Sequence, residues 1–259
     1  MNGARASAGK DCPARRRMQS HKHNDQQPTQ RFAPVRIHQH EERYPCTLPR
    51  YLAGRAPTAL TVRGNVDLLS RLTSLGLVAL FCSVECPPPL IGQTYDLARA
   101  LRDVGVPVIS GFHSPMEKEC LLVLLQGSQP LIMCLARSIE QMRLAKDWKP
   151  ALQQGRLLLL SPFVGSPRRV TLARAGFRNE CIAALADLLL IAHAAPGGQL
   201  ERLCHITRSW GKPLLALAHE ANAGLLALGA KPIGPDQVRT GAALPNLPSQ
   251  MYLSAERTA

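Results

Sequence analysis

The sequence has little aromatic character and no long apolar run. Only 4% of its 259 residues are Phe, Tyr or Trp, although 46% are hydrophobic. No apolar stretch reaches the roughly 18 residues that a membrane-spanning helix needs, and the first residues carry no apolar core of a secretory signal. These absences predict a cytoplasmic globular protein without a membrane partner.

The fingerprints of common cofactor and metal sites are also missing. Neither GxxxxGK[ST] nor GxGxxG occurs, which argues against ATP hydrolysis and nicotinamide chemistry. The eight cysteines are scattered, with no CxxC pair, and no pair of histidines has zinc-finger spacing. We therefore expect no cofactor and no metal, and we expect Cys82, Cys134 and Cys181 to be reduced thiols in the core.

Negative charge is scarce. The formal net charge is +13 at pH 7, which favours an anionic partner, most commonly nucleic acid. Residues 1–43 hold nine Lys or Arg against four Asp or Glu and so contribute +5, which leaves +8 of the total for the remainder. The basic character therefore belongs to the expected folded part as well as to the N-terminal segment.

Composition divides the chain into three parts. Residues 1–43 are rich in Arg, His, Gln and Asn with almost no apolar periodicity, so we expect a disordered basic tail. An ordered domain is expected over 44–234, with Leu60 and Val62 on an edge strand near its start. Residues 235–259 show no firm pattern and are expected to be a poorly structured C-terminal tail.

Apolar runs alternate with amphipathic segments through most of the expected domain. Short, continuous apolar runs predict buried strands at 77–83, 106–109, 131–135, 156–161, 187–192 and 213–217. Helical periodicity predicts helices at 94–104, 115–125, 138–153, 178–186, 200–210 and 221–228. This alternation predicts an α/β fold, Rossmann-like, with a mostly parallel sheet and helices on both faces.

Ligands of open α/β sheets bind beyond the carboxyl ends of the strands. Three predicted strand-to-helix loops carry the Gly or Asn that frees backbone N–H groups for an anion, and nearby arginines supply charge. Ordinary solvated basic loops would show the same pattern. The candidate phosphate- or DNA-binding residues are Ser110, Gly111, Arg168, Arg169, Arg178, Asn179, Gly197 and Gly198.

No catalytic set stands out from the titratable residues. His113 could act as a base, but a single loop histidine usually faces solvent. Glu117 and Glu119 are interpreted as charges on a helix surface. His193 and His219 lie near predicted strand ends and could enter a pocket. The titratable residues therefore predict no particular reaction.

Read together, several short motifs resemble the bacterial DNA-processing protein A (Smf) family in order and spacing. They run from position 44 to about 233, which is most of the expected domain. The matching elements are YPxxL at 44–48, RGN at 63–65, VISG at 108–111, RN at 178–179, the Gly198 and Leu200 pair, GKPLLAL at 211–217 and the N…LL…GA pattern over 222–230.

The sequence departs from the family pattern at several of its motifs. The GSR turn of the family is replaced by CSV at 82–84, and the family's ARGIDxxAH segment by HSPME at 113–117 with Leu121 in place of the histidine. Glu180 replaces an arginine and His193 a glutamate. We also expect the chain to lack the C-terminal winged-helix domain of the family.

The resemblance implies a Rossmann-like, usually dimeric protein that binds single-stranded DNA. Such proteins protect incoming DNA during natural transformation and help to load the recombinase RecA; they are not enzymes. The resemblance further implies that the arginines at 168, 169 and 178 contact backbone phosphates. Affinity is then expected to be modest and strongly dependent on salt.

Two alternatives remain open. The PGGQLE segment at 196–201 resembles a shortened form of the PGGxGTxxE motif of nucleotide phosphoribohydrolases, in which the loop holds a phosphate and the glutamate assists glycosidic cleavage. Alternatively, loss of the GSR turn would leave a degenerate interaction scaffold that no longer binds DNA.

Overall fold

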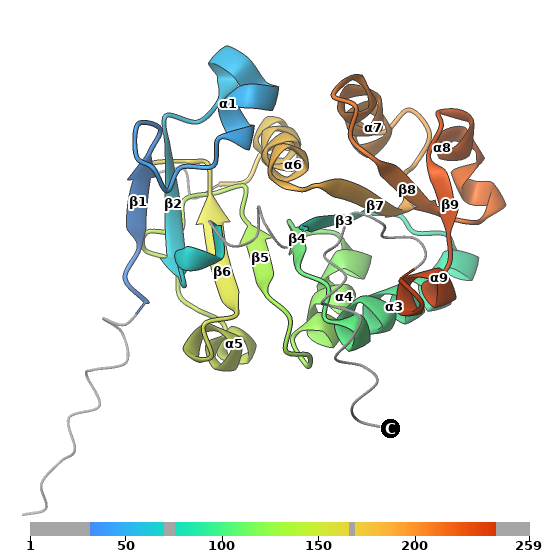
Figure 1. Cartoon of the computed structure of the whole chain (residues 1–259), viewed down its shortest axis with the longest axis horizontal. Coiled ribbons are helices and arrows are strands. Elements are labelled where there is room, and N and C mark those ends of the chain that lie inside the picture. Colours follow the sequence, from blue (N-terminus) through green and yellow to red (C-terminus); the bar gives the residue numbers. More distant parts are fainter. Residues whose placement is uncertain (1–31, 70–75, 166–168, 242–259) are drawn as a thin grey trace, which may run out of the picture. The chain divides into compact units, whose positions relative to one another are not determined.

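Within the part of the chain that the structure describes, nine strands form one sheet, in the order β1-β2-β6-β5-β4-β3-β7-β8-β9 (Figure 1). The structure is a computed structural model, and it describes residues 32–69, 76–165 and 169–241. The strands are β1 (Val35–His38), β2 (Ala59–Gly64), β3 (Val78–Cys82), β4 (Val108–Ser110), β5 (Leu131–Cys134), β6 (Leu157–Ser161), β7 (Leu188–His193), β8 (Leu214–Leu217) and β9 (Lys231–Ile233).

Most of the sheet is parallel. Strands β6, β5, β4, β3, β7, β8 and β9 pair in parallel, whereas β2 and β1 are added antiparallel beside β6. The chain builds outward from β3 to β6, then returns to the other side of β3 to form β7, β8 and β9. The predicted α/β fold with a mostly parallel, Rossmann-like sheet is confirmed.

Helices cover both faces of this sheet (Figure 1). One face carries α1 (Thr47–Leu52), α6 (Leu172–Leu185), α7 (Gln199–Ser209) and α8 (Ala223–Ala227). The other carries α3 (Pro88–Val104), α4 (Pro115–Leu124), α5 (Lys149–Gln153) and α9 (Pro235–Arg239). Short 3-10 turns are η2 (Ala53–Arg55), η3 (Lys146–Trp148) and η4 (Glu220–Asn222). None of the described helices is both long and apolar enough to span a membrane.

Burial explains why the strands are continuous apolar runs. All five residues of β6 and all six of β7 are buried, because each strand has helices on both sides of the sheet. The three cysteines predicted to be core residues are buried as well. Helix α4 begins at Pro115, where the predicted helix over 115–125 begins, and Ser114 caps it with a capping box.

The N-terminal prediction is wrong for residues 32–43. Strand β1 forms there, and it pairs with β2 from Val35↔Val62 to His38↔Ala59. Consequently β2 is not an edge strand. The segment has no apolar periodicity because only Ile37 of β1 is buried, and pairing with a partner distant in sequence holds the strand in place. Residues 1–31 lie outside the described part.

The predicted helix over 138–153 is also wrong in its first half. Only η3 and α5 form, at 146–153. The Arg63 guanidinium binds this segment in a non-helical conformation. Its Nη1 donates to the carbonyls of Ile139 (3.4 Å) and Met142 (2.6 Å), and its Nε donates to the carbonyl of Phe32 (2.9 Å). The arginine of the RGN motif thus ties three chain segments together and does not face a ligand.

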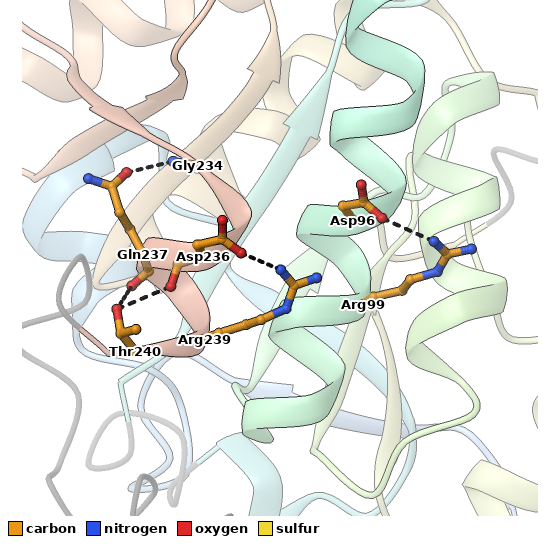
Figure 2. Close-up of polar contacts among 7 residues, drawn as sticks. All are labelled: Asp96, Arg99, Gly234, Asp236, Gln237, Arg239 and Thr240. Atoms are coloured by element: carbon orange, nitrogen blue, oxygen red, sulfur yellow. Dashed lines mark hydrogen bonds and ion pairs between the residues drawn. The ribbon is translucent and has the colours of Figure 1, made fainter.

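The C-terminal prediction is likewise wrong for residues 235–239, which form α9 beside α3. Figure 2 shows the polar contacts here: Asp96 pairs with Arg99 at 3.0 Å, and Asp236 with Arg239 at 2.6 Å. The Gln237 side chain accepts the N–H of Gly234 at the start of α9. These exposed pairs contribute little energy, whereas buried Val238 anchors the helix on α3.

Candidate functional site

A cavity of about 560 Å³ opens at the carboxyl ends of β3, β4 and β7, which is where the strand order reverses. Open α/β sheets bind ligands at such a switch point, because the loops that follow the two neighbouring strands diverge there. We call it the switch-point cavity. The polar residues of its lining include Ser83, His113, Glu117, Arg178, Asn179 and Arg202.

Arg178 and Asn179 reach this cavity from the middle of α6, not from a loop. The helix predicted to begin at Arg178 begins earlier, at Leu172, so these residues do not lie at a loop-to-helix turn. The hydroxyl of Thr171 accepts the N–H of Arg174 and caps the helix six residues earlier than predicted. The backbone N–H of Asn179 is therefore part of the helix, and only its side chain can meet a ligand.

Arg178 is a buried cation whose N–H donors are not all hydrogen-bonded. Its side chain is only 5% exposed, and Nη1 donates to the carbonyl of Cys134 at 3.3 Å. Its Nε is buried and has no hydrogen-bond partner. The guanidinium lies against Gly111, where a Cβ would come within 1.9 Å of Nη1. The fold thus brings together two predicted site residues that lie far apart in the sequence, and Gly111 leaves the space that the guanidinium fills.

Glu117 is the residue that sequence reasoning misjudged most. It is buried, not a surface charge. Its carboxylate accepts the N–H groups of Cys82 (3.1 Å), His113 (2.8 Å) and Ser114 (3.4 Å), and so joins the end of β3 to the loop after β4. Burial raises the pKa of Glu117, while the charge of Arg178 and these N–H groups oppose the rise. The S-x-x-E capping signature at 114–117 was the available signal.

His113 lies at the mouth of the cavity. Its backbone is held by Glu117, and burial together with the charge of Arg178 lowers the pKa of its imidazole. A neutral imidazole beside a cationic guanidinium can donate or accept a hydrogen bond without adding charge.

The predicted backbone donors are largely engaged within the protein. Ser110 is fully buried, and its hydroxyl accepts the N–H of Phe112 at 3.2 Å. Gly198 lines the cavity, but its N–H donates to Ala195 at 3.0 Å. The N–H of Gly197 donates to the carboxylate of Glu201 at 2.7 Å. An incoming anion would therefore meet mainly side chains here.

Of the two remaining predicted arginines, Arg168 lies outside the described residues, and Arg169 does not line the cavity. Arg169 is exposed, and its carbonyl accepts a hydrogen bond from Arg174 at 2.7 Å. Arg202, which sequence reasoning overlooked, does line the cavity from one turn inside α7. Its position four residues after Gly198 on an uncapped helix start was the only signal.

The two histidines near strand ends have structural roles. His193 is buried, and its Nδ1 lies 3.1 Å from the side-chain oxygen of Asn222. The Asn222 amide donates in turn to the carbonyls of Ala192 and Leu217, so the pair joins β7 to β8. His219 accepts the N–H of Ala221 and caps a 3-10 turn.

Within the described ranges, no group of His, Cys, Asp or Glu is arranged to hold a metal ion. The seven cysteines there are free thiols, five of them buried. Glu201, the residue a phosphoribohydrolase would use, has its carboxylate bound to the N–H of Gly197. The arrangement at the switch point suits recognition of an anion by a buried arginine and an exposed one, Arg178 and Arg202.

The chain is similar to a known protein family in sequence and to solved structures in fold. A family model described as DNA recombination-mediator protein A matches residues 36–228. The structure of DNA processing protein A from Streptococcus pneumoniae is similar with a TM-score of 0.67 and 20% identity, over 85% of this chain and 75% of that one. DNA processing protein A from Helicobacter pylori gives the same TM-score and identity, over 84% and 98%. A search of the curated proteins finds no match.

Proposed function

The chain belongs to the DNA recombination-mediator protein A family, and on this premise we propose that it binds single-stranded DNA in DNA uptake and RecA-mediated recombination. The observation that carries the proposal is Arg178, a buried guanidinium with an unpartnered Nε at the switch-point cavity. A buried cation that the protein itself leaves partly unsatisfied is costly unless an anionic ligand completes its hydrogen bonds.

Three further features support a single strand as that ligand. Arg202 adds an exposed cation to the same wall, and Asn179 adds an amide that can both donate and accept. The net charge of +13 favours a polyanion. The Helicobacter pylori relative was solved to describe its single-stranded DNA binding mode.

The finer parts of the proposal rest on the family resemblance. We propose that the protein acts in the cytoplasm without catalysis, as a homodimer, and passes its strand to RecA. We also propose that the DNA-processing domain extends beyond 44–234 to include β1 and α9, because both pack on the unit that begins at Phe32. The arginines at 168 and 169 remain predicted phosphate contacts.

Fluorescence anisotropy of a labelled oligothymidine across a salt series tests the proposal. The parent chain should bind the single strand more tightly than duplex DNA, and binding should weaken as salt rises. Arg202→Ala should reduce the salt slope by about one phosphate contact, because the exposed side chain can be removed without disturbing the core. Arg178→Lys, which keeps the charge but loses the planar fork, should weaken binding further.

Arg99→Ala is the matched control. Arg99 is exposed on α3, pairs only with Asp96, and lines none of the cavities described here (Figure 2). It removes the same charge as Arg202→Ala, so its binding should match that of the parent. Absence of binding at low salt, or equal losses in the two variants, would contradict a site at the switch point.

A further inference from the structure

A second cavity, of about 460 Å³, adjoins the first at the carboxyl ends of β4 and β5. Its walls are mostly apolar, and the apolar side chains that matter here are Phe112, Leu121, Met133, Leu135 and Trp148. Its volume is in the range of small-molecule sites, which are typically apolar with a few placed polar groups. We call it the apolar cavity.

The charged groups around the two cavities differ. The switch-point cavity has the carboxylates of Glu85 and Glu117 in its lining as well as arginines. The ionisable side chains that line the apolar cavity are His113, Lys118, Arg137 and Arg178, and none of them is acidic. Its polar side chains are therefore mostly donors, which suits a ligand that presents carbonyl oxygens and ring nitrogens next to a phosphate.

Two residues connect the cavities. Arg178 and His113 line both of them, so a ligand anchored on the Arg178 guanidinium is at the edge of the apolar cavity at once. The connecting loop is also strained, because Phe112 adopts φ of 45°, a backbone conformation that bulky L-residues rarely hold. Strain of this kind persists where the surrounding structure requires it, commonly at ligand sites.

We propose that the apolar cavity receives one unstacked nucleobase of the single strand whose phosphate lies at Arg178. This inference rests on the proposed function and adds the position at which a base is bound. Trp148 and Phe112 supply ring surface, as proteins that bind single strands commonly do. Arg137 and Lys118 line the same cavity, and in this proposal they contact the phosphates on either side of that base.

A strand fits this cavity better than an apolar protein side chain does. Four ionisable side chains of basic type line the cavity, and an apolar partner residue would offer no acceptor to any of them. A nucleotide matches both parts of the site, since it has a flat ring system for the walls and an anionic backbone for the rim. Low aromatic content makes Trp148 a distinctive probe, because the chain has only two tryptophans.

Tryptophan fluorescence and a coupling measurement together test this inference. In a Trp210→Phe background, Trp148 is the only tryptophan; Trp210 packs on Tyr51 elsewhere in the molecule, at 5.1 Å between ring centroids. Titration with oligothymidine should change the emission of Trp148 at the same concentrations at which anisotropy reports binding. Trp148→Phe is the reciprocal variant, and its remaining Trp210 should not respond.

The coupling measurement uses an oligothymidine in which a single abasic residue is scanned through the strand. At one position the missing base should weaken binding by about tenfold. In Trp148→Leu that penalty should shrink, because both changes remove the same contact. Urea unfolding of each variant checks that it is folded.

The outcomes separate the two proposals. Coupling together with a Trp148 signal supports the base site. Binding by anisotropy with no change in Trp148 emission and additive penalties would overturn it, would leave single-strand binding intact, and would favour an apolar partner residue as the occupant. Absence of any strand binding would overturn the proposed function and this inference together.

Discussion

Two buried cations are associated with helix α6, and their hydrogen bonding differs: Arg178 belongs to the middle of α6, whereas Lys212 comes from the segment before β8 and contacts the C-terminal end of α6. Lys212 donates from Nζ to the carbonyls of Ala183 (2.7 Å), Ala184 (2.8 Å) and Ala186 at the C-terminus of α6. Its Nζ also lies 4.2 Å from the centroid of the Tyr51 ring. Arg178, within α6, has one long hydrogen bond to a carbonyl and an unpartnered Nε.

The difference distinguishes a structural cation from one that is available to a ligand. All three donors of Lys212 are used to satisfy carbonyls that a helix end leaves without partners, and a positive charge there is favoured by the helix dipole. Arg178 has no such set of acceptors, yet it lines two cavities. Burial alone therefore does not identify a functional charge; Arg178, which is buried with an unpartnered Nε beside a cavity, is the cation that we propose to meet a ligand.

Removing Lys212, the structural cation, should have the largest effect on the free energy of unfolding. Lys212→Met should lower the free energy of unfolding by about 3 kcal/mol, because three buried carbonyls lose their donor. Urea unfolding followed by circular dichroism measures this loss. Lys231→Met removes an exposed lysine from β9 and should change stability by no more than about 0.5 kcal/mol. Similar effects in the two variants would refute a capping role for Lys212.

Removing the Arg178 guanidinium should lower the affinity for single-stranded DNA more than it changes stability. Arg178→Met keeps the length of the side chain but removes the guanidinium, so single-strand affinity should fall by about 2 kcal/mol, roughly thirtyfold. Stability should change by only about 1 kcal/mol, because an incompletely satisfied charge leaves the interior. Anisotropy and urea unfolding on the same sample measure both quantities. A large loss of stability with unchanged affinity would reverse the assignments of Arg178 and Lys212.

Moving the Arg178 guanidinium without removing its charge sharpens the comparison further. In Gly111→Ala the new methyl group would lie 1.9 Å from Nη1, so the guanidinium must shift, and affinity should fall by about tenfold. Combined with Arg178→Met, the glycine change should add no further loss of affinity. Gly92→Ala is the matched control, since nothing lies within 4 Å of a Cβ at this position of α3. Additive losses would show that Gly111 acts independently of Arg178.

The smallest expected effect is on the pH dependence of stability. Burial lowers the pKa of Lys212 from 10.5 to about 8, although Asp187 opposes the change. Between these values the unfolded chain holds the proton that the folded chain has released, so stability from this group rises with pH. From about pH 7.5 to about pH 8.5 the parent should gain about 0.7 kcal/mol relative to Lys212→Met.

Comparing the parent with Lys212→Met controls for all other titratable groups, because both proteins contain them. Buried thiols such as Cys134, whose pKa is raised to about 12, contribute with the opposite sign above their ordinary pKa, but they are present in both proteins. A difference in unfolding free energy that stays flat over this range would show that the pKa of Lys212 is not lowered.

Local sequence patterns were sufficient for the central sheet and most of its helices. The apolar runs that form β3 to β8 are visible because helices bury both faces of each strand, so nearly every residue must be apolar. The start of α4 was visible because Ser114, Pro115 and Glu117 signal it within four residues. Strand β1 and helix α9 were missed because each buries only one side chain and depends on a partner far along the chain.

The candidate site divides in the same way. The sequence by itself determined that Gly111, Arg178 and Asn179 belong to the part of the chain near the carboxyl ends of the strands. Only the tertiary structure decided that Arg178 lies on Gly111, that Ser110 faces inward, and that Glu117 is buried. Hydrophobic periodicity records which residues leave water, but it carries no information on which distant groups meet there. Those meetings depend on the crossovers between parallel strands, whose geometry is a property of the whole sheet.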